Sequence, residues 1–229
     1  MDKVDRPTPR KDEGKDNTVK SLSVEETNRL LEIMDNEPLK WNAYVRLMLD
    51  TGMRKGECCA IQWKDLDLER RQLIVRHTLN YTKSSGVVLE PPKNGKTRIV
   101  DYSEKTADLL RKIKEVQNAT VQSAFVFAQE DSTCPIHPQS PTRYLNKLGK
   151  KNGFKNLHPH LLRHTHVSLG LLAGADVTSM SERIGHADPS FTLRQYSHTN
   201  TEGIIKAGEC FRKAIDNKIC ENVRYLYAG

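Results

Sequence analysis

The apolar residues of this chain follow helical spacing towards both ends and strand spacing in the middle. Ser23 and Glu26 form a capping box, the S-x-x-E pattern that starts helices, and apolar residues at helical spacing follow it. Between the helical parts, residues 72–82, 87–90 and 98–100 are β-rich and are separated by turn residues. The pattern predicts a mainly α fold with a small antiparallel β-sheet (α+β).

Proline and glycine mark the ends of the expected helices. Pro38 opens a second helix and Gly52 ends it, because proline suits the first helical turn and glycine the position after the last. A third, short helix is expected at residues 55–61. Further helices are expected at residues 109–116, 141–151, 160–172, 177–184, 189–196 and 202–218.

Composition divides the 229 residues into three parts. Residues 1–20 are polar and highly charged, which predicts a flexible linker or arm and not a secretory signal. Residues 21–200 carry the patterned helices and strands and form the expected domain. Residues 201–229 form an expected C-terminal helix or tail. No apolar run approaches the ~18 residues of a membrane span, so we expect a cytoplasmic protein without a membrane partner.

Charge and cysteine content indicate the kind of partner and the state of the thiols. The net charge is +7, and residues 141–200 hold eight Lys or Arg against three Asp or Glu, a net of +5. This favours a polyanion as partner, although a solvated basic helix face explains the local excess equally well. The five cysteines form no C-x-x-C pair and are expected to be reduced thiols.

Two arginines stand where an anion could be held. Arg54 follows a glycine at a helix start, and a guanidinium there can hold two phosphate oxygens; a plain surface arginine is the alternative. Glu57 could orient Arg54 or form an ordinary i,i+3 ion pair with it. His160 and Arg163 are also three residues apart, so they share one helix face and can point at one phosphate.

Histidines near Arg163 raise the question of zinc. The cluster is His158, His160, His164 and His166. No glutamate stands between the i,i+4 pair as it does in H-E-x-x-H, and no cysteine or acid is close in sequence. We therefore expect no metal, while histidines without function remain an alternative.

Three further groups could take part in phosphate chemistry. Lys93 lies beside Asn94-Gly95, a strong tight-turn signal, and a lysine on a mobile hairpin could donate a proton; Lys96 competes for that role. His186 follows Gly185 at the end of a helix. Tyr196 is by default a packing residue, because a phenol with a pKa of about 10 needs nearby cations and a base to become a nucleophile.

Five motifs follow one another along the chain: Thr-Gly-x-Arg-x-x-Glu, the hairpin Lys, His-x-Leu-Arg-His-Thr, Gly-His and Tyr-x-His. In this order they resemble the catalytic domain of tyrosine recombinases, a family that includes phage and conjugative-transposon integrases. The resemblance covers roughly residues 22–215. It implies that the catalytic groups are Arg54 and Arg163 as phosphate clamps, Lys93 as general acid, His160 and His186 as proton-handling groups, and Tyr196 as nucleophile. Glu57 matches the position that supports the first arginine.

The resemblance also implies a chemistry and its partners. Attack by Tyr196 on duplex DNA would form a 3′-phosphotyrosine that keeps the bond energy, so neither ATP nor any other cofactor is expected. Additional DNA contacts are expected from Lys96, Arg143, Lys147, Lys150, Lys151 and Arg194.

The family further implies a homo-oligomer on DNA (a tetrameric synapse), a monomer without DNA, possible DNA-bending or directionality proteins, and association with the nucleoid. The family's N-terminal core-binding domain does not appear in the sequence, and residues 1–20 look like its linker. Residues 201–229 could dock on a neighbouring protomer or pack in cis. An integrase of a mobile element or phage is expected; a chromosome-dimer resolvase, a type IB topoisomerase-like enzyme and a non-catalytic DNA-binding protein remain alternatives.

Overall fold

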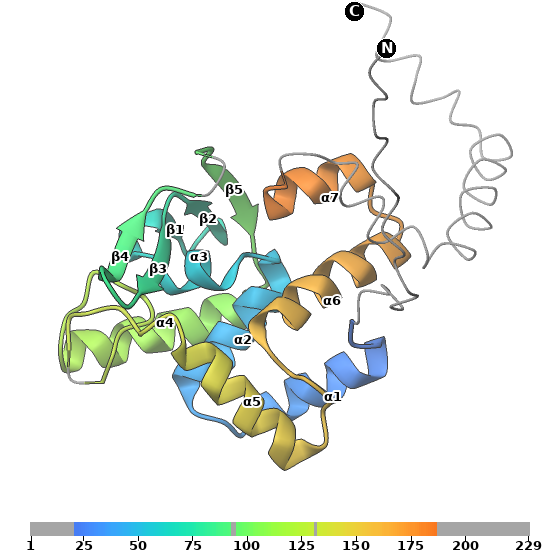
Figure 1. Ribbon diagram of the computed structural model, residues 1–229, viewed down its shortest axis with the longest axis horizontal. Helices are drawn as coiled ribbons and strands as arrows, with labels where there is room; N and C mark the ends of the chain where they lie inside the picture. The colour runs from blue at the N-terminus through green and yellow to red at the C-terminus, as the bar shows by residue number, and fades with distance from the viewer. Residues whose placement is uncertain (1–20, 93–94, 131, 187–229) are drawn as a thin grey trace, which may run out of the picture.

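The computed structural model describes residues 21–92, 95–130 and 132–186, and its strands lie between two groups of helices along the chain, as the sequence predicts (Figure 1). The helices are α1 (Val24–Met34), α2 (Leu39–Thr51), α3 (Lys55–Cys59), η1 (Trp63–Asp65), α4 (Glu104–Ala119), α5 (Ser140–Asn152), α6 (Pro159–Leu172) and α7 (Val177–Ile184). The strands are β1 (Leu66–Asp67), β2 (Gln72–Val75), β3 (Thr78–Thr82), β4 (Gly86–Glu90) and β5 (Arg98–Asp101). This confirms the predicted mainly α fold with a small antiparallel β component.

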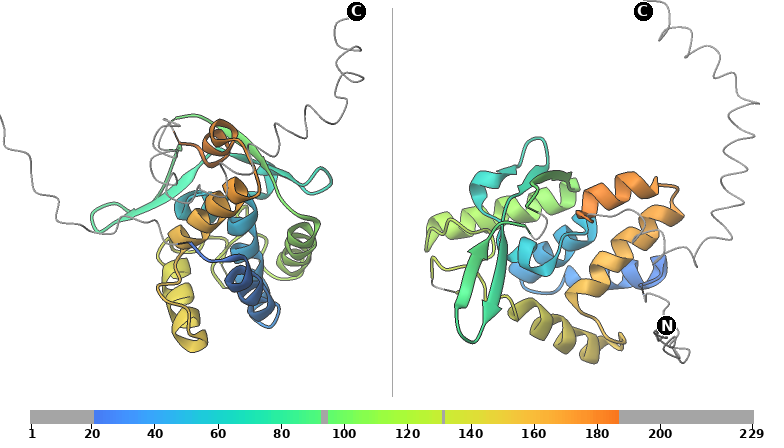
Figure 2. Two further views of the ribbon diagram at one scale, coloured as in Figure 1. Left: turned by 90° about the vertical axis from the view of Figure 1, so that its right-hand side faces the viewer. Right: turned by 45° about the horizontal axis from the view of Figure 1, so that its top comes forward.

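The strands form two sheets where one was expected. β2 is the central strand of an antiparallel sheet of order β1-β2-β5, in which Leu73 lies opposite Val100. β3 and β4 form a separate antiparallel hairpin that reaches out to one side of the helical body (Figure 2). The run 72–82 is therefore two strands, interrupted between Val75 and Thr78.

A hairpin around Lys93 would pair β4 with β5, and this predicted pairing was wrong. β4 pairs with β3 and β5 pairs with β2, so the segment between β4 and β5 connects two sheets. Pro91 and Pro92 give the physical reason, because proline cannot donate a ladder hydrogen bond and neither residue extends β4. Lys93 itself lies outside the described residues.

Local signals account for most helix ends. The Ser23 hydroxyl accepts from the Glu26 N–H and the Glu26 carboxylate accepts from the Ser23 N–H, which is the predicted capping box. α4 starts five residues earlier than predicted because Ser103 caps it by accepting from the Thr106 N–H. The helices predicted at 189–196 and 202–218 lie outside the described residues.

α2 is the central helix of the domain. It runs between α4 and α6 (Figure 1), and Ala43, Tyr44, Leu47 and Met48 are fully buried in the main core. α7 packs against α6 and against β5. Among the helices of the described part of the chain, none is long and apolar enough to cross a membrane.

Candidate active site

The connection between α2 and α3 places the first candidate arginine. Gly52 ends α2 with a φ of 62°, and a Cβ there would lie 2.5 Å from Cδ2 of His166 and 2.9 Å from Cγ2 of Ile184. Glycine is therefore required both by the backbone and by the close approach of α6 and α7. The turn brings Arg54, the residue just before α3, next to those two helices.

Glu57 is held between two guanidiniums. Arg54 donates from its backbone N–H to Oε2 at 2.9 Å and from Nη1 to Oε1 at 3.0 Å. Arg98, at the start of β5, donates from Nη2 to Oε2 at 2.6 Å and from Nη1 to Oε1 at 3.2 Å. Burial pushes the pKa of Glu57 upward, but the hydrogen bonds and charges of Arg98 and Arg54 outweigh it and hold that pKa below its ordinary value. The predicted contact between Glu57 and Arg54 is present, and Arg98 joins it.

α6 contributes the second predicted arginine and its neighbouring histidine. Arg163 is 2% exposed, and its Nη1 donates to the Gly52 carbonyl at 2.7 Å. His160, one turn earlier on α6, is exposed, and its ring lies edge-on to that of His164 with 4.5 Å between centroids. Desolvation and then the charge of Arg163 lower the pKa of His160. The sequence correctly placed His160 and Arg163 together.

The end of α7 places His186, another predicted catalytic residue. Gly185 ends the helix in the left-handed conformation with a φ of 69°, and its carbonyl accepts from Arg54 Nη2 at 2.9 Å. His186 follows directly. Burial, and then the positive charges of Arg163 and Arg54, lower the pKa of His186 to about 4. His186 is therefore neutral at pH 7 and lies within the field of both arginines.

Arg183 fastens α7 to the rest of the domain. Its Nη2 donates to the carbonyls of Asp50 and Asp101 at 2.9 Å each, and its Nη1 pairs with the Asp101 carboxylate. Its Nε donates to Nε2 of His166 at 3.3 Å, while Nδ1 of His166 lies 2.7 Å from the Leu49 carbonyl. His166 therefore carries its hydrogen on Nδ1, and burial in particular lowers its pKa to about 4.

Two of the four histidines considered for zinc are engaged with other protein groups. His158 caps α6, its Nδ1 accepting from the Leu161 N–H at 3.1 Å, and His166 is engaged with Leu49 and Arg183 as above. Within residues 21–92, 95–130 and 132–186, no group of three or more His, Cys, Asp or Glu is arranged to hold a metal ion.

The remaining predicted residues either lie outside the described part of the chain or are exposed. Lys93, Arg194 and Tyr196 lie outside the described residues. Lys96 is exposed in the segment before β5. The basic residues predicted to contact DNA on α5 are all exposed: Arg143, Lys147, Lys150 and Lys151. The ammonium of Lys151 also lies 3.7 Å from the Glu37 carboxylate.

Sequence reasoning missed Arg98 and Arg183. Both are part-buried and make their contacts across more than 40 residues of chain to Glu57, Asp50 or Asp101, or to each other. In the sequence, each of these arginines stands beside apolar strand or helix positions. Surface arginines commonly occur in the same pattern, so the pattern did not single them out. Their partners become visible only once β5 and α7 are placed.

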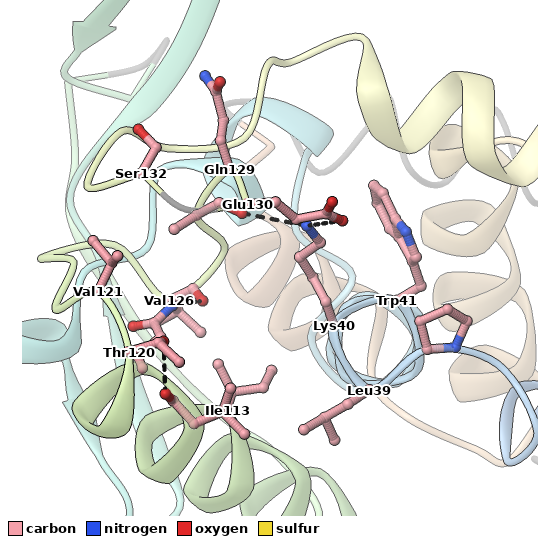
Figure 3. Close-up of a pocket in the computed structure, with 14 residues that line it drawn as sticks. Leu39, Lys40, Trp41, Ile113, Thr120, Val121, Val126, Gln129, Glu130 and Ser132 are labelled. Atoms are coloured by element: carbon pink, nitrogen blue, oxygen red, sulfur yellow. Dashed lines mark hydrogen bonds and ion pairs between the residues drawn. The ribbon is translucent and has the colours of Figure 1, made fainter.

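A hollow of about 580 Å³ lies elsewhere, between the start of α2, the end of α4, residues 120–130 and Ser132 (Figure 3). Leu39, Trp41 and Ile113 give it an apolar wall, and an ion pair of 3.6 Å between Lys40 and Glu130 lies at its side. None of the predicted catalytic residues that the structure describes lines it, so the hollow is separate from the cluster.

The cluster can hold an anion and accept a proton. Arg54 and Arg163 come from different segments. Arg54 donates to the Gly185 carbonyl at the end of α7, and Arg163 donates to the Gly52 carbonyl at the end of α2. Guanidiniums fixed in this way match the oxygens of a phosphate. Because His186 has a lowered pKa, its imidazole is neutral at pH 7, and the ring nitrogen without a hydrogen can accept a proton.

Comparison with known proteins gives a consistent result. The model of the phage integrase family matches residues 20–202. The tyrosine recombinase XerA of Saccharolobus solfataricus is 35% identical over 154 residues, which are 67% of this chain and 44% of XerA. The ICEBs1 integrase of Bacillus subtilis is 25% identical over 182 residues, 76% of this chain and 49% of that protein.

Solved structures share the fold. A Tn1549 transposon integrase in complex with a circular intermediate DNA superposes with a TM-score of 0.75 at 22% identity, over 86% of this chain and 67% of the integrase. A crystal structure of XerA recombinase gives a TM-score of 0.67 at 26% identity, over 85% of this chain and 66% of that one. The chain spans about half the length of the curated relatives it matches. With most of its length matched by the family model, this chain belongs to the phage integrase family.

Proposed function

We propose that this chain is the catalytic part of a site-specific tyrosine recombinase that cleaves and rejoins duplex DNA. The observation that carries the proposal is the cluster of Arg54, Arg163, His160 and His186, which come from three separate segments and influence one another electrostatically. Two guanidiniums beside neutral imidazoles suit a phosphodiester that is attacked and later released.

In the proposed reaction, Tyr196 attacks the scissile phosphorus and the 5′-oxygen leaves, giving a 3′-phosphotyrosine and a free 5′-hydroxyl. Arg54 and Arg163 stabilise the charge that develops on the phosphoryl oxygens. A neutral histidine, His160 or His186, takes the phenol proton, and Lys93 or Lys96 donates one to the leaving oxygen. Reversal with the 5′-hydroxyl of another strand rejoins the DNA without an external energy source.

Double-stranded DNA is the proposed partner. Among the structural relatives, the Tn1549 integrase is in complex with a circular intermediate DNA, and XerH recombinase is bound to its difH substrate. On this chain the exposed basic residues of α5 supply phosphate contacts, together with Lys96 and Arg194. We extend the proposal to a homo-oligomer on DNA and a monomer without it.

The proposed division of the chain follows its composition. Residues 1–20 serve as a linker, residues 21–200 as the catalytic domain, and residues 201–229 as a tail that docks on a neighbouring protomer. The integrases among the relatives, those of ICEBs1 and Staphylococcus phage L54a, favour a mobile element or phage as source.

Strand exchange tests the proposal against its alternatives. Two differently labelled duplexes that carry the DNA flanking the gene are incubated with the chain, and supercoiled plasmid is incubated separately. We expect recombinant strands with wild type and none with Tyr196→Phe, in the presence of EDTA. Plasmid relaxation without exchange would indicate a topoisomerase-like enzyme, and binding without either reaction would indicate a non-catalytic DNA-binding protein.

A further inference from the structure

Arg98 is the more enclosed of the two arginines that hold Glu57. The exposed fraction of its side chain is 11%, compared with 30% for Arg54. Both of its terminal nitrogens donate to the Glu57 carboxylate, at 2.6 and 3.2 Å. This paired geometry fixes the plane of the carboxylate, as a fork-to-fork contact does.

Arg98 has a second attachment at the end of α7. Its Nε donates to the Arg183 carbonyl at 2.8 Å. A Cβ on Gly185 would lie 2.9 Å from Nη1 of Arg98, so the guanidinium packs directly against the residue that precedes His186. One side chain from β5 therefore touches both the buried carboxylate on α3 and the last turn of α7.

Both partners of Arg54 depend on these attachments. The guanidinium of Arg54 donates to Glu57 and to the Gly185 carbonyl, and Arg98 touches each of these two residues. Arg98 itself is poorly placed to hold substrate, because each of its three nitrogens already donates to a protein oxygen. Its contacts instead join the two residues to which the guanidinium of Arg54 donates.

We propose that Arg98 is a positioning residue of the cleavage site: by holding Glu57 and the end of α7 together, it keeps Arg54 and His186 directed at one phosphate. The proposal rests on the proposed recombinase function and adds a residue to it. Burying a carboxylate between two arginines carries a large desolvation penalty, so packed apolar residues would stabilise the fold at least as well, and a role in geometry explains the arrangement better.

The test compares Arg98→Gln with a control matched for burial. Arg46 is 12% exposed and makes three hydrogen bonds, to Asn42, the Leu31 carbonyl and Asp35, none of which belongs to the candidate site. Arg46→Gln therefore removes an equally enclosed guanidinium elsewhere in the fold. DNA affinity and the single-turnover rate of covalent complex formation at saturating DNA are measured for both variants and for wild type.

We expect Arg98→Gln to lower the single-turnover rate by about 10- to 100-fold, the scale of a small misplacement of reacting groups. DNA affinity should stay within about twofold, since phosphate contacts over a wide surface dominate it. Arg46→Gln should stay near wild type in both measurements. Arg98→Lys keeps a positive charge beside Glu57, but its single nitrogen cannot reach both Glu57 and the Arg183 carbonyl. The rate of this variant should therefore fall between those of Arg98→Gln and Arg46→Gln.

Three outcomes would overturn the proposal: a rate for Arg98→Gln within threefold of wild type, a loss equal to that of Arg46→Gln, or parallel losses of rate and affinity. If Arg98→Gln does not fold, Arg98→Lys decides between the same outcomes. A wild-type chain that binds DNA but forms no covalent complex would instead count against the proposed function, so the two failures are distinguishable.

Discussion

Glu57 offers the sharpest test of the electrostatic account. Its carboxylate accepts four hydrogen bonds, three from the guanidiniums of Arg54 and Arg98 and one from a backbone N–H, and it is 2% exposed. Glu57→Gln removes the negative charge and turns an amide donor towards two guanidiniums that are themselves donors. Two positive charges then lie close together without their common partner.

The expected cost follows from that geometry. Breaking a buried ion pair by removing one partner costs about 3–5 kcal/mol. Because Arg54 is 30% exposed and can be partly hydrated, we expect the lower end, about 3 kcal/mol in the free energy of unfolding. For a domain of this size that corresponds to a fall in Tm of about 6–12 °C.

A natural control is present on α4. Glu104 also bridges two arginines, accepting from Arg71 at 2.9 Å and from Arg111 at 2.8 Å, but 56% of its side chain is exposed. Water replaces lost contacts there, so Glu104→Gln should change Tm very little. Thermal and urea unfolding followed by circular dichroism measure both variants. Equal shifts for Glu57→Gln and Glu104→Gln would refute the argument that burial gives the Glu57 pair its strength.

The contribution of Glu57 to the free energy of unfolding should also depend on pH. Its pKa in the folded chain is below the ordinary value of 4.5, so the stabilisation is present above pH 4.5 and is lost as pH falls through the folded value. The difference in unfolding free energy between wild type and Glu57→Gln should therefore be constant near neutral pH and shrink in acid. A difference that grows as pH falls below 4.5 would contradict the assigned sign.

Three other changes have definite expected outcomes. Gly52→Ala places a methyl group 2.5 Å from His166 and forces a strained φ, so urea unfolding should show a loss of about 2 kcal/mol or more; a neutral result would contradict the close approach of α6. Neutralising the four exposed basic residues of α5 together should weaken DNA binding and make it less salt-dependent in fluorescence titrations; an unchanged salt slope would remove α5 from the interface. A substrate with a 5′-thiol leaving group needs no proton, so it should rescue cleavage by Lys93→Ala, and rescue of Lys96→Ala instead would reassign the general acid.

Features of the fold that depend on local chemistry could be read from the sequence. The capping box at Ser23 and the glycine that ends α2 are decided by a few neighbouring residues, and the structure has both. Strand pairing was harder to foresee. Burial of Leu73 opposite Val100 joins β2 to β5 across 27 residues, and nothing local to either strand specifies that choice.

The same division applies to the candidate site. His160 and Arg163 share a helix face, so their proximity follows from spacing alone, and the turn at Gly52 indicates Arg54. Arg98 could not be found in this way. Its contact with Glu57 depends on the register of β5 and on the packing of α7, which arise only in the folded domain.

Covalent trapping tests the central claim most directly. A nicked duplex carrying the DNA that flanks the gene is incubated with wild type and with Tyr196→Phe in EDTA, and the products are separated on a denaturing gel. Peptide mass spectrometry then identifies the residue joined to DNA. The account predicts a protein–DNA adduct with wild type only, linked through Tyr196 to a 3′-phosphate. An adduct that persists in Tyr196→Phe, or one that maps to another residue, would contradict it.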